Sequence, residues 1–353
     1  MVLTCESQNN TTKASNNRLI YLDIARGISM LCIILGHLGN ANINRVVFTF
    51  HVSIFYVISG FFISEKKEYG TYIKSRLKAL IVPYYLTCIA IVVIGTVEGF
   101  ILHGTVGAFD AMKKWVYASL YGAGDSYSSP FYIKAIGAIW FLWASFWGSI
   151  LLKYSLRMKD WQRILFISFL FAVGYFSRKL FWFPLSIQAG CCATLFMYLG
   201  FCAKKTKSGW DVLDKEVKKA LFICAALVWF FFIKDFRSFW LVHCDVGRGI
   251  VDIIGSLCAC YVVFDICKRI DRVPILSKGL AYIGRYSIFM LCIHIIELNL
   301  FPWWQIAEKI CCKLSIPSCL ELLFVIIGKF LFDISLTVLA SQNRIVKKLF
   351  GIK

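Results

Sequence analysis

Two ionisable residues, Arg26 and His37, lie eleven positions apart inside the first apolar stretch of the chain, residues 18–38. Because burying an ionisable group in hydrocarbon is costly, such residues usually serve a function. At about 100° per residue, eleven steps along a helix bring both side chains to one face. Asp23, three positions before Arg26, can offset its charge. Since histidine exchanges protons near neutral pH, this stretch predicts a helix that carries out acid–base chemistry.

Two further histidines are expected to join His37. The connection after the first stretch is short, so the second stretch returns antiparallel and brings His51 back to the depth of His37. The stretch over 280–300 runs in the same direction as the first and carries His294 with Glu297 three residues later. We therefore expect the three imidazoles to converge in the outer half of a membrane. Each also has a simpler interpretation, as a packing residue bonded to a neighbouring carbonyl.

The composition indicates a membrane protein. The chain has 353 residues, of which 59% are hydrophobic and 17% charged, and its mean hydropathy is +0.70, outside the usual range of soluble domains. Apolar stretches near the length of a bilayer span occur ten times, at 19–39, 44–64, 79–101, 133–152, 162–177, 185–203, 220–236, 249–267, 280–300 and 317–339. The sequence therefore predicts an all-α, polytopic membrane helix bundle with about ten transmembrane helices.

The orientation follows from the basic residues in the connections. Alternate connections, taken together with both tails, hold 25 Lys and Arg, and the opposite set holds 11. Because cytoplasmic loops are enriched in these residues, both termini are predicted to be cytoplasmic. We expect a disordered cytoplasmic tail over 1–17, a transmembrane domain over 18–341 and a basic cytoplasmic tail over 342–353.

Several classes of site are excluded by missing motifs. The net charge of +19 is explained by the cytoplasmic loops, and no basic arm or RNA-binding motif is present, so no nucleic-acid partner is expected. The cysteines show no zinc-type spacing, which predicts no metal site. The sequence leaves open whether four cysteines near the predicted outer face form a disulfide: Cys244, Cys311, Cys312 and Cys319.

Six motifs in order resemble the membrane-bound acyltransferase-3 family, which includes bacterial O-acetyltransferases of cell-surface sugars. They cover most of the chain: Arg26 to His37 preceded by YLDIARG (21–27), FHVSIFYVISGFFIS (50–64), RLKALIVPYY (76–85), IWFLWASFW (139–147), LFMYLGFCAKK (195–205) and YIGRYSIFMLCIH (282–294). The resemblance implies a multi-pass enzyme of the inner or plasma membrane. Such an enzyme moves an acyl group, usually acetyl, from cytoplasmic acyl-CoA to a hydroxyl of a cell-envelope glycan.

The resemblance also gives the polar residues roles. It implies that His37 is the general base on the acceptor hydroxyl, or alternatively an acyl-carrying nucleophile, and that Arg26 positions the thioester. Acetyl-CoA is then a co-substrate, with no bound cofactor. The phosphates of CoA are expected on basic residues near the cytoplasmic side, with Arg76 favoured over Lys74 and Lys78, and Arg285 is a further acyl-CoA-binding candidate. Supporting roles at the catalytic or acceptor site fall to His51, His294, Glu297 and Asp23.

Three alternatives stay open at this level. The basic cluster over 74–78 is also what the positive-inside rule produces by itself. The predicted outer segment 102–132, rich in Gly, Ser and Tyr, is either an acceptor-binding loop or a plain linker. Buried Asp, Arg and His are typical of proton-coupled transporters too, so a secondary transporter or polysaccharide export protein is the rival interpretation. The acceptor sugar and the oligomeric state are not specified by any motif.

Overall fold

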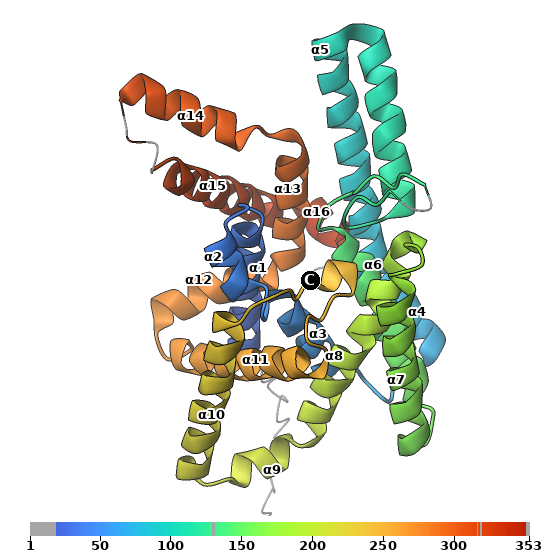
Figure 1. The fold of residues 1–353 in the computed structure, drawn as a ribbon, viewed down its shortest axis with the longest axis vertical. Coiled ribbons are helices and arrows are strands. Elements are labelled where there is room, and N and C mark those ends of the chain that lie inside the picture. The colour runs from blue at the N-terminus through green and yellow to red at the C-terminus, as the bar shows by residue number, and fades with distance from the viewer. Residues whose placement is uncertain (1–18, 129–130, 316, 318–319, 351–353) are drawn as a thin grey trace, which may run out of the picture.

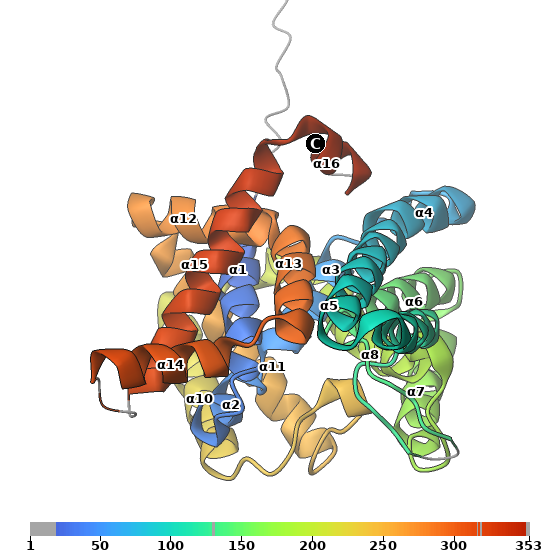
Figure 2. The same cartoon turned by 90° about the horizontal axis from the view of Figure 1, so that it is seen from above.

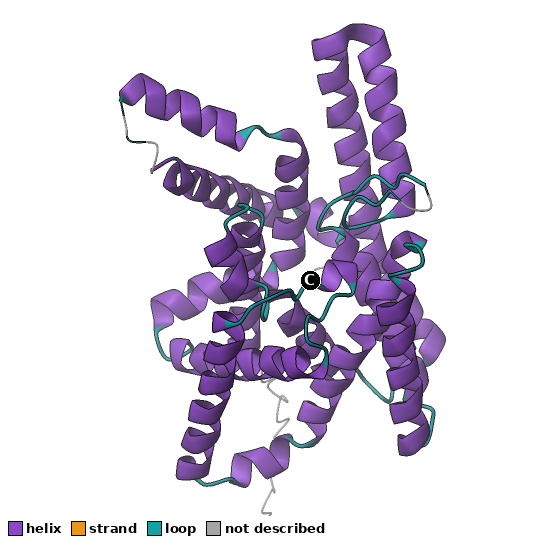
Figure 3. Cartoon of the chain, viewed as in Figure 1, coloured by secondary structure: helices purple, strands orange, loops and turns teal. Residues whose placement is uncertain are grey.

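The structure is a computed structural model and describes residues 19–128, 131–315, 317 and 320–350. Within these ranges every regular element is helical, as Figure 3 shows, so the predicted all-α fold class is confirmed. The expected disordered tail over 1–17 lies outside the described residues. The α-helices of the first half are α1 (Ile20–Gly36), α2 (Ala41–Val47), α3 (His51–Phe61), α4 (Tyr69–Arg76), α5 (Val82–Tyr121), α6 (Trp140–Ser155) and α7 (Asp160–Ser177).

The second half continues as a series of helices joined by short turns and one longer loop over 235–249. Its α-helices are α8 (Ile187–Lys205), α9 (Lys207–Val212), α10 (Lys215–Lys234), α11 (Ile250–Ile270), α12 (Pro274–Arg285), α13 (Ser287–Leu300), α14 (Trp303–Leu314), α15 (Glu321–Gln342) and α16 (Arg344–Leu349). A short π-helix spans Leu77–Ile81, and short 3-10 helices span Pro184–Ser186 and Leu241–His243. Cys244 and Cys312 carry free thiols, and Cys319 lies outside the described residues.

Each of the ten predicted apolar stretches contains at least one helix, but several are interrupted. The stretch over 44–64 is divided between α2 and α3, and the stretch over 280–300 bends by 69° between α12 and α13. Among the described residues five helices are long and apolar enough to cross a membrane, or six if the bent pair is one span. The count of ten and the cytoplasmic termini remain predictions.

The prediction of a long outer connecting segment over 102–132 is wrong, because most of this segment is helical. Residues up to Tyr121 belong to α5, whose two arms meet at Gly104, where φ is 66° and ψ is −154°. Figure 1 shows these arms side by side, standing out from the rest of the molecule. The second arm is not predicted from the sequence because Asp110, Lys113 and Lys114 interrupt its apolar pattern. Of the described residues, 122–128 and 131–139, between α5 and α6, are left as a connecting segment.

Helix α1 holds a central place, since it contacts α2, α3, α11, α12, α13 and α15. In Figure 2, α13 and α15 lie beside it. Its closest neighbour is α12, because glycines allow the two backbones to touch. A methyl group at Gly27 would lie 2.1 Å from the carbonyl oxygen of Leu280, and one at Gly284 would lie 1.8 Å from that of Asp23. Small residues at such contacts are the usual means by which membrane helices approach closely.

This contact predicts that Gly284→Leu destabilises the protein. No side chain fits between the two backbones, and overpacking costs about 1–3 kcal/mol or more. We expect a lower midpoint of thermal unfolding in detergent. We also expect Arg26 to be displaced, because it lies on α1 beside this contact. Gly279→Leu on the same helix is the matched control, because nothing lies within 4 Å of a methyl group there. Equal midpoints for the two variants would contradict the close packing.

Candidate active site

His37 lies at the C-terminal end of α1 and is held there by its own helix. Its Nδ1 atom is 2.8 Å from the carbonyl oxygen of Ile33, so Nδ1 carries a proton and donates it to that oxygen. No hydrogen-bond partner of Nε2 is found among the described residues, and the ring lines a cavity. His37 therefore presents an unprotonated nitrogen to the cavity, as a general base requires. The C-terminal dipole of α1 favours the positive charge that the ring would gain.

His294, on α13, connects His37 to a pair of buried carboxylates. Its Nε2 is 3.3 Å from Nδ1 of His37. Its Nδ1 is 2.8 Å from Oε1 of Glu297 and 3.1 Å from Oδ2 of Asp333, and all three side chains are buried. A protonated Nδ1 satisfies both carboxylates and leaves Nε2 as a second, longer acceptor for the Nδ1–H of His37, which it shares with the carbonyl of Ile33. This arrangement fixes the orientation of the His37 ring, as the acid of a catalytic triad does for its histidine.

Lys329, on α15, pairs with one of the two carboxylates of this cluster. Its ammonium lies 2.9 Å and 3.0 Å from the two carboxylate oxygens of Glu297. The indole N–H of Trp303 also donates to Glu297. Lys329 is 3% exposed, so the ion pair is shielded from water. Buried charges of this kind are stable only when paired and hydrogen-bonded, which is what the structure shows for Glu297.

The same cluster contains atoms of the type that bind metals. Ligand atoms of His294, Glu297 and Asp333 lie within 4.8 Å of one another. However, the ammonium of Lys329 already occupies both oxygens of Glu297 and supplies a positive charge at that place. We therefore treat the group as an ion-pair network, and the prediction of no metal site remains a prediction.

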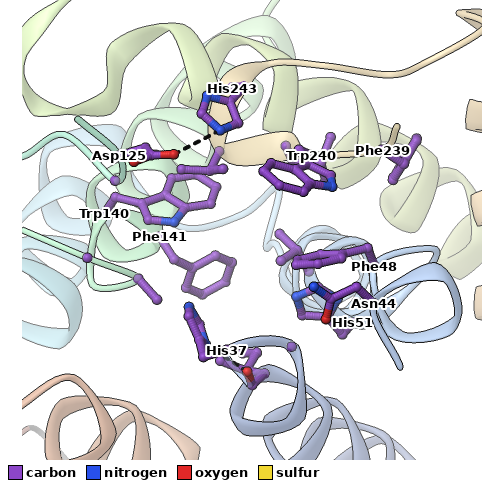
Figure 4. A pocket seen from close by; sticks show the side chains of 18 of the residues that line it. His37, Asn44, Phe48, His51, Asp125, Trp140, Phe141, Phe239, Trp240 and His243 are labelled. Carbon is purple, nitrogen blue, oxygen red and sulfur yellow. Dashed lines mark hydrogen bonds and ion pairs between the residues drawn. The ribbon is translucent and has the colours of Figure 1, made fainter. Parts of the chain in front are cut away.

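The cavity beside His37 has a volume of about 310 Å³. We call it the histidine cavity, and its polar lining comes from five residues: His37, Asn44, His51, Asp125 and His243. Aromatic rings form much of the rest, as Figure 4 shows for Phe48, Trp140, Phe141 and Trp240. His51 donates Nδ1–H to the carbonyl of Val47 at 2.6 Å, and Oδ1 of Asn44 has no hydrogen-bond partner among the described residues. The cavity thus combines unfilled hydrogen-bonding capacity with flat apolar surfaces.

One side of this cavity, which we call its roof, is formed by two loops that are far apart in the sequence and carry Asp125 and His243. His243 donates from Nε2 to Asp125 at 3.1 Å, and its Nδ1 accepts from the Tyr127 hydroxyl at 3.1 Å. Burial keeps the pKa of His243 below its ordinary value, despite the nearby Asp125, so the ring is neutral at pH 7. Its loop is fixed by an ion pair between Asp245 and Arg178 at 2.9 Å. These contacts hold the two loops, and with them Asp125 and His243, in fixed positions at the cavity.

A second cavity, of about 210 Å³, lies nearer the N-terminal end of α1. We call it the arginine cavity, because three guanidinium groups line it: Arg26, Arg76 and Arg285. Arg26 is paired with Asp23 at 3.4 Å, and Arg76 donates to the hydroxyl of Tyr72 at 3.0 Å. Serines supply further polar groups, and the hydroxyl of Ser145 has no partner among the described residues. Such a lining suits an anionic ligand with polar groups along its length.

The two cavities share part of their lining. Ile33 of α1, Phe141 of α6 and Leu291 of α13 line both. Ile33 lies between Arg26 and His37 on the same helix, so the cavities are stacked along α1. At about 1.5 Å per residue, Arg26 and His37 are about 16 Å apart along the axis.

Comparison with known proteins decides the family. The acyltransferase-3 model, described as an acyltransferase domain, matches residues 19–336. The chain belongs to the acyltransferase-3 family. It is therefore a multi-pass membrane acyltransferase, as its apolar helices also indicate. No curated protein and no solved structure matches the chain.

Within this acyltransferase the predicted site residues divide between the two cavities. The structure brings His37, His51, His294 and Glu297 to the histidine cavity or the network behind it. It brings Arg26, Arg76 and Arg285 to the arginine cavity, with Asp23 paired to Arg26. Lys74 and Lys78 are exposed and line neither cavity, so the structure does not bring them to the others.

The structure also places at the site several residues that were not predicted to belong to it. Lys329 and Asp333 lie four positions apart in the last apolar stretch, and this spacing of opposite charges in a membrane helix is a signal that would have found them. Asp125, Trp240 and His243 had no such signal. They lie in connecting segments, where polar and aromatic residues are ordinary.

Proposed function

We propose that this acyltransferase moves an acetyl group from cytoplasmic acetyl-CoA to a hydroxyl group of a cell-envelope glycan, in the inner or plasma membrane. The observation that carries the proposal is the stacking of two different cavities along α1. One is lined by three arginines, the other by imidazoles and aromatic rings, and they share Ile33, Phe141 and Leu291.

The arginine cavity is the proposed donor site. Arg26, Arg76 and Arg285 supply forked N–H donors of the kind that bind phosphate oxygens in pairs. The unpartnered hydroxyl of Ser145 is available to an amide of the pantetheine arm. With the phosphates on the arginines, the arm points along α1 toward His37 and carries the thioester to the shared wall.

The histidine cavity is the proposed acceptor site. Trp140 and Trp240 offer flat faces for a sugar ring, and Asp125 and Asn44 offer oxygens for its hydroxyl groups. None of the residues that line this cavity is Lys or Arg, which favours an uncharged acceptor over an anionic one. The glycan enters from the side of the roof loops and presents one hydroxyl to His37.

The reaction then needs one base. Nε2 of His37 takes the proton of the acceptor hydroxyl while the hydroxyl oxygen attacks the carbonyl carbon of the thioester. The carbon–sulfur bond breaks, and the thiolate of CoA receives the proton from His37. The products are the acetyl ester and free CoA. His294 acts as a positioning residue, because it holds Nδ1 of His37 and links it to Glu297 and Asp333.

The experiment is transfer from radiolabelled acetyl-CoA by the full chain, purified and placed in liposomes containing glycolipids extracted from the producing cells. Label in the glycolipid fraction together with free CoA supports the proposal, and isolation of the labelled product identifies the acceptor. Absence of both label and free CoA contradicts it. Movement of glycan across the liposome membrane without CoA release would instead support the rival transporter function.

The donor site makes a separate prediction. Arg76→Ala and Arg285→Ala each remove a charge-assisted contact to phosphate, which is worth about 1.5–3 kcal/mol. We expect KM for acetyl-CoA to rise about tenfold or more in steady-state assays, with a smaller change in kcat. Lys78→Ala is the matched control, because Lys78 is exposed and lines neither cavity. An equal rise in KM for Lys78→Ala would show that only the surface charge matters.

A further inference from the structure

The lining that the two cavities share is apolar and comes from three helices. Ile33 comes from α1, Phe141 from α6 and Leu291 from α13, and we call these three residues the partition. Ile33 and Leu291 are buried, at 6% and 4% exposed. Because no polar side chain belongs to it, the partition offers water no hydrogen bonds between the donor and acceptor sites.

The ring of Phe141 is held in place by its neighbours. It stacks on Tyr56 with a centroid distance of 5.1 Å and an angle of 25°, and it meets the edge of Phe55 at 5.5 Å. Figure 4 shows this ring and the imidazole of His37 projecting toward the same space. Phe141 is therefore a fixed part of the wall next to the base.

The partition lies at the depth that the reacting group must pass. Ile33 is four residues before His37, so it lies about 6 Å below it along α1, and about 10 Å beyond Arg26. When the acceptor hydroxyl is hydrogen-bonded to His37 and attacks the thioester carbonyl, the acyl chain of the thioester lies at the depth of the partition. The chain must fit between the partition and the acceptor in a cavity of about 310 Å³.

We propose that the partition, and Phe141 above all, sets the length of the acyl group that this enzyme transfers and restricts it to short chains. This inference rests on the proposed function and names the feature that selects its donor. Each methylene beyond acetyl presses on Phe141 or takes space from the acceptor. One methylene more or fewer in such a pocket typically changes kcat/KM by about 10- to 200-fold.

The test uses the full chain in liposomes with the same glycolipid fraction and compares acetyl-, butyryl- and octanoyl-CoA. CoA release and acyl transfer are both measured. For the wild type we expect kcat/KM with butyryl-CoA to be at least about tenfold below that with acetyl-CoA. For Phe141→Ala we expect the ratio of butyryl to acetyl kcat/KM to rise at least about tenfold, because the removed ring leaves room for the chain.

Two further variants keep the test decisive. Leu291→Ala widens the partition from another helix and is also expected to raise the butyryl-to-acetyl ratio of kcat/KM. It provides the test if Phe141→Ala does not fold. Phe146→Ala is the matched control on α6, because Phe146 is buried and lines neither cavity, and its butyryl-to-acetyl ratio should equal that of the wild type.

The outcomes separate this inference from the proposed function. Equal use of the three acyl-CoAs by the wild type overturns the inference and leaves the acyltransferase reaction intact. The same holds if Phe141→Ala and Leu291→Ala transfer normally but keep the wild-type ratio, or if Phe146→Ala shifts the ratio as much as they do. Absence of CoA release from every acyl-CoA with the wild type overturns the proposed function itself.

Discussion

Replacing His37 with alanine is expected to lower kcat for acetyl transfer by about 10²- to 10⁴-fold, the usual effect of removing a positioned base. The ring has one nitrogen held by Ile33 and His294 and the other directed to the cavity, where it can take the proton of the acceptor hydroxyl. KM for acetyl-CoA should change little, because the arginine cavity is untouched. Steady-state kinetics with purified protein measure both quantities.

Two controls make this result specific. His103→Ala changes an exposed histidine at the tip of α5, and its kcat should equal that of the wild type. His294→Gln keeps a side chain that can hydrogen-bond but breaks the link to Glu297 and Asp333, so an intermediate loss is expected. A kcat within tenfold of the wild type for His37→Ala would exclude it as the base.

Replacing Lys329 with methionine is expected to produce the largest loss of stability. The change leaves the carboxylate of Glu297 buried without the ammonium that binds both of its oxygens. Removing one partner of a buried ion pair typically costs about 3–5 kcal/mol of folding free energy. Equilibrium unfolding in detergent, followed by tryptophan fluorescence, measures the loss. Acetyl transfer should fall as well, because Glu297 also holds His294.

The double variant Lys329→Met with Glu297→Gln distinguishes an ion pair from simple packing. With both charges of this pair removed, Glu297 no longer leaves a charge without its partner, so part of the stability should return. Lys309→Met on α14 is the control, because Lys309 is exposed and its loss should change stability by less than about 0.5 kcal/mol. A double variant that is less stable than Lys329→Met would show that the pairing of these charges is not what stabilises the cluster.

The sequence alone determined the class of this protein and one helix of its site. Bilayer-length apolar stretches predict membrane helices because hydrocarbon leaves the backbone no other way to satisfy its hydrogen bonds. Arg26 and His37 were recognised because a charged or titratable group in such a stretch is costly enough to require a reason. Both inferences rest on local spacing and composition, which a single helix expresses by itself.

The tertiary structure decided what His37 faces and where the cavities lie. His294 meets His37 across 257 positions of sequence, and Asp333 completes the network from a third helix. The second arm of α5 packs against the first arm, although three charges interrupt its apolar pattern and its sequence predicts a loop. The partition joins Ile33, Phe141 and Leu291, each an ordinary apolar residue in its own helix. Spacing along one helix reveals a face, but only packing between helices determines which residues meet and what space they enclose.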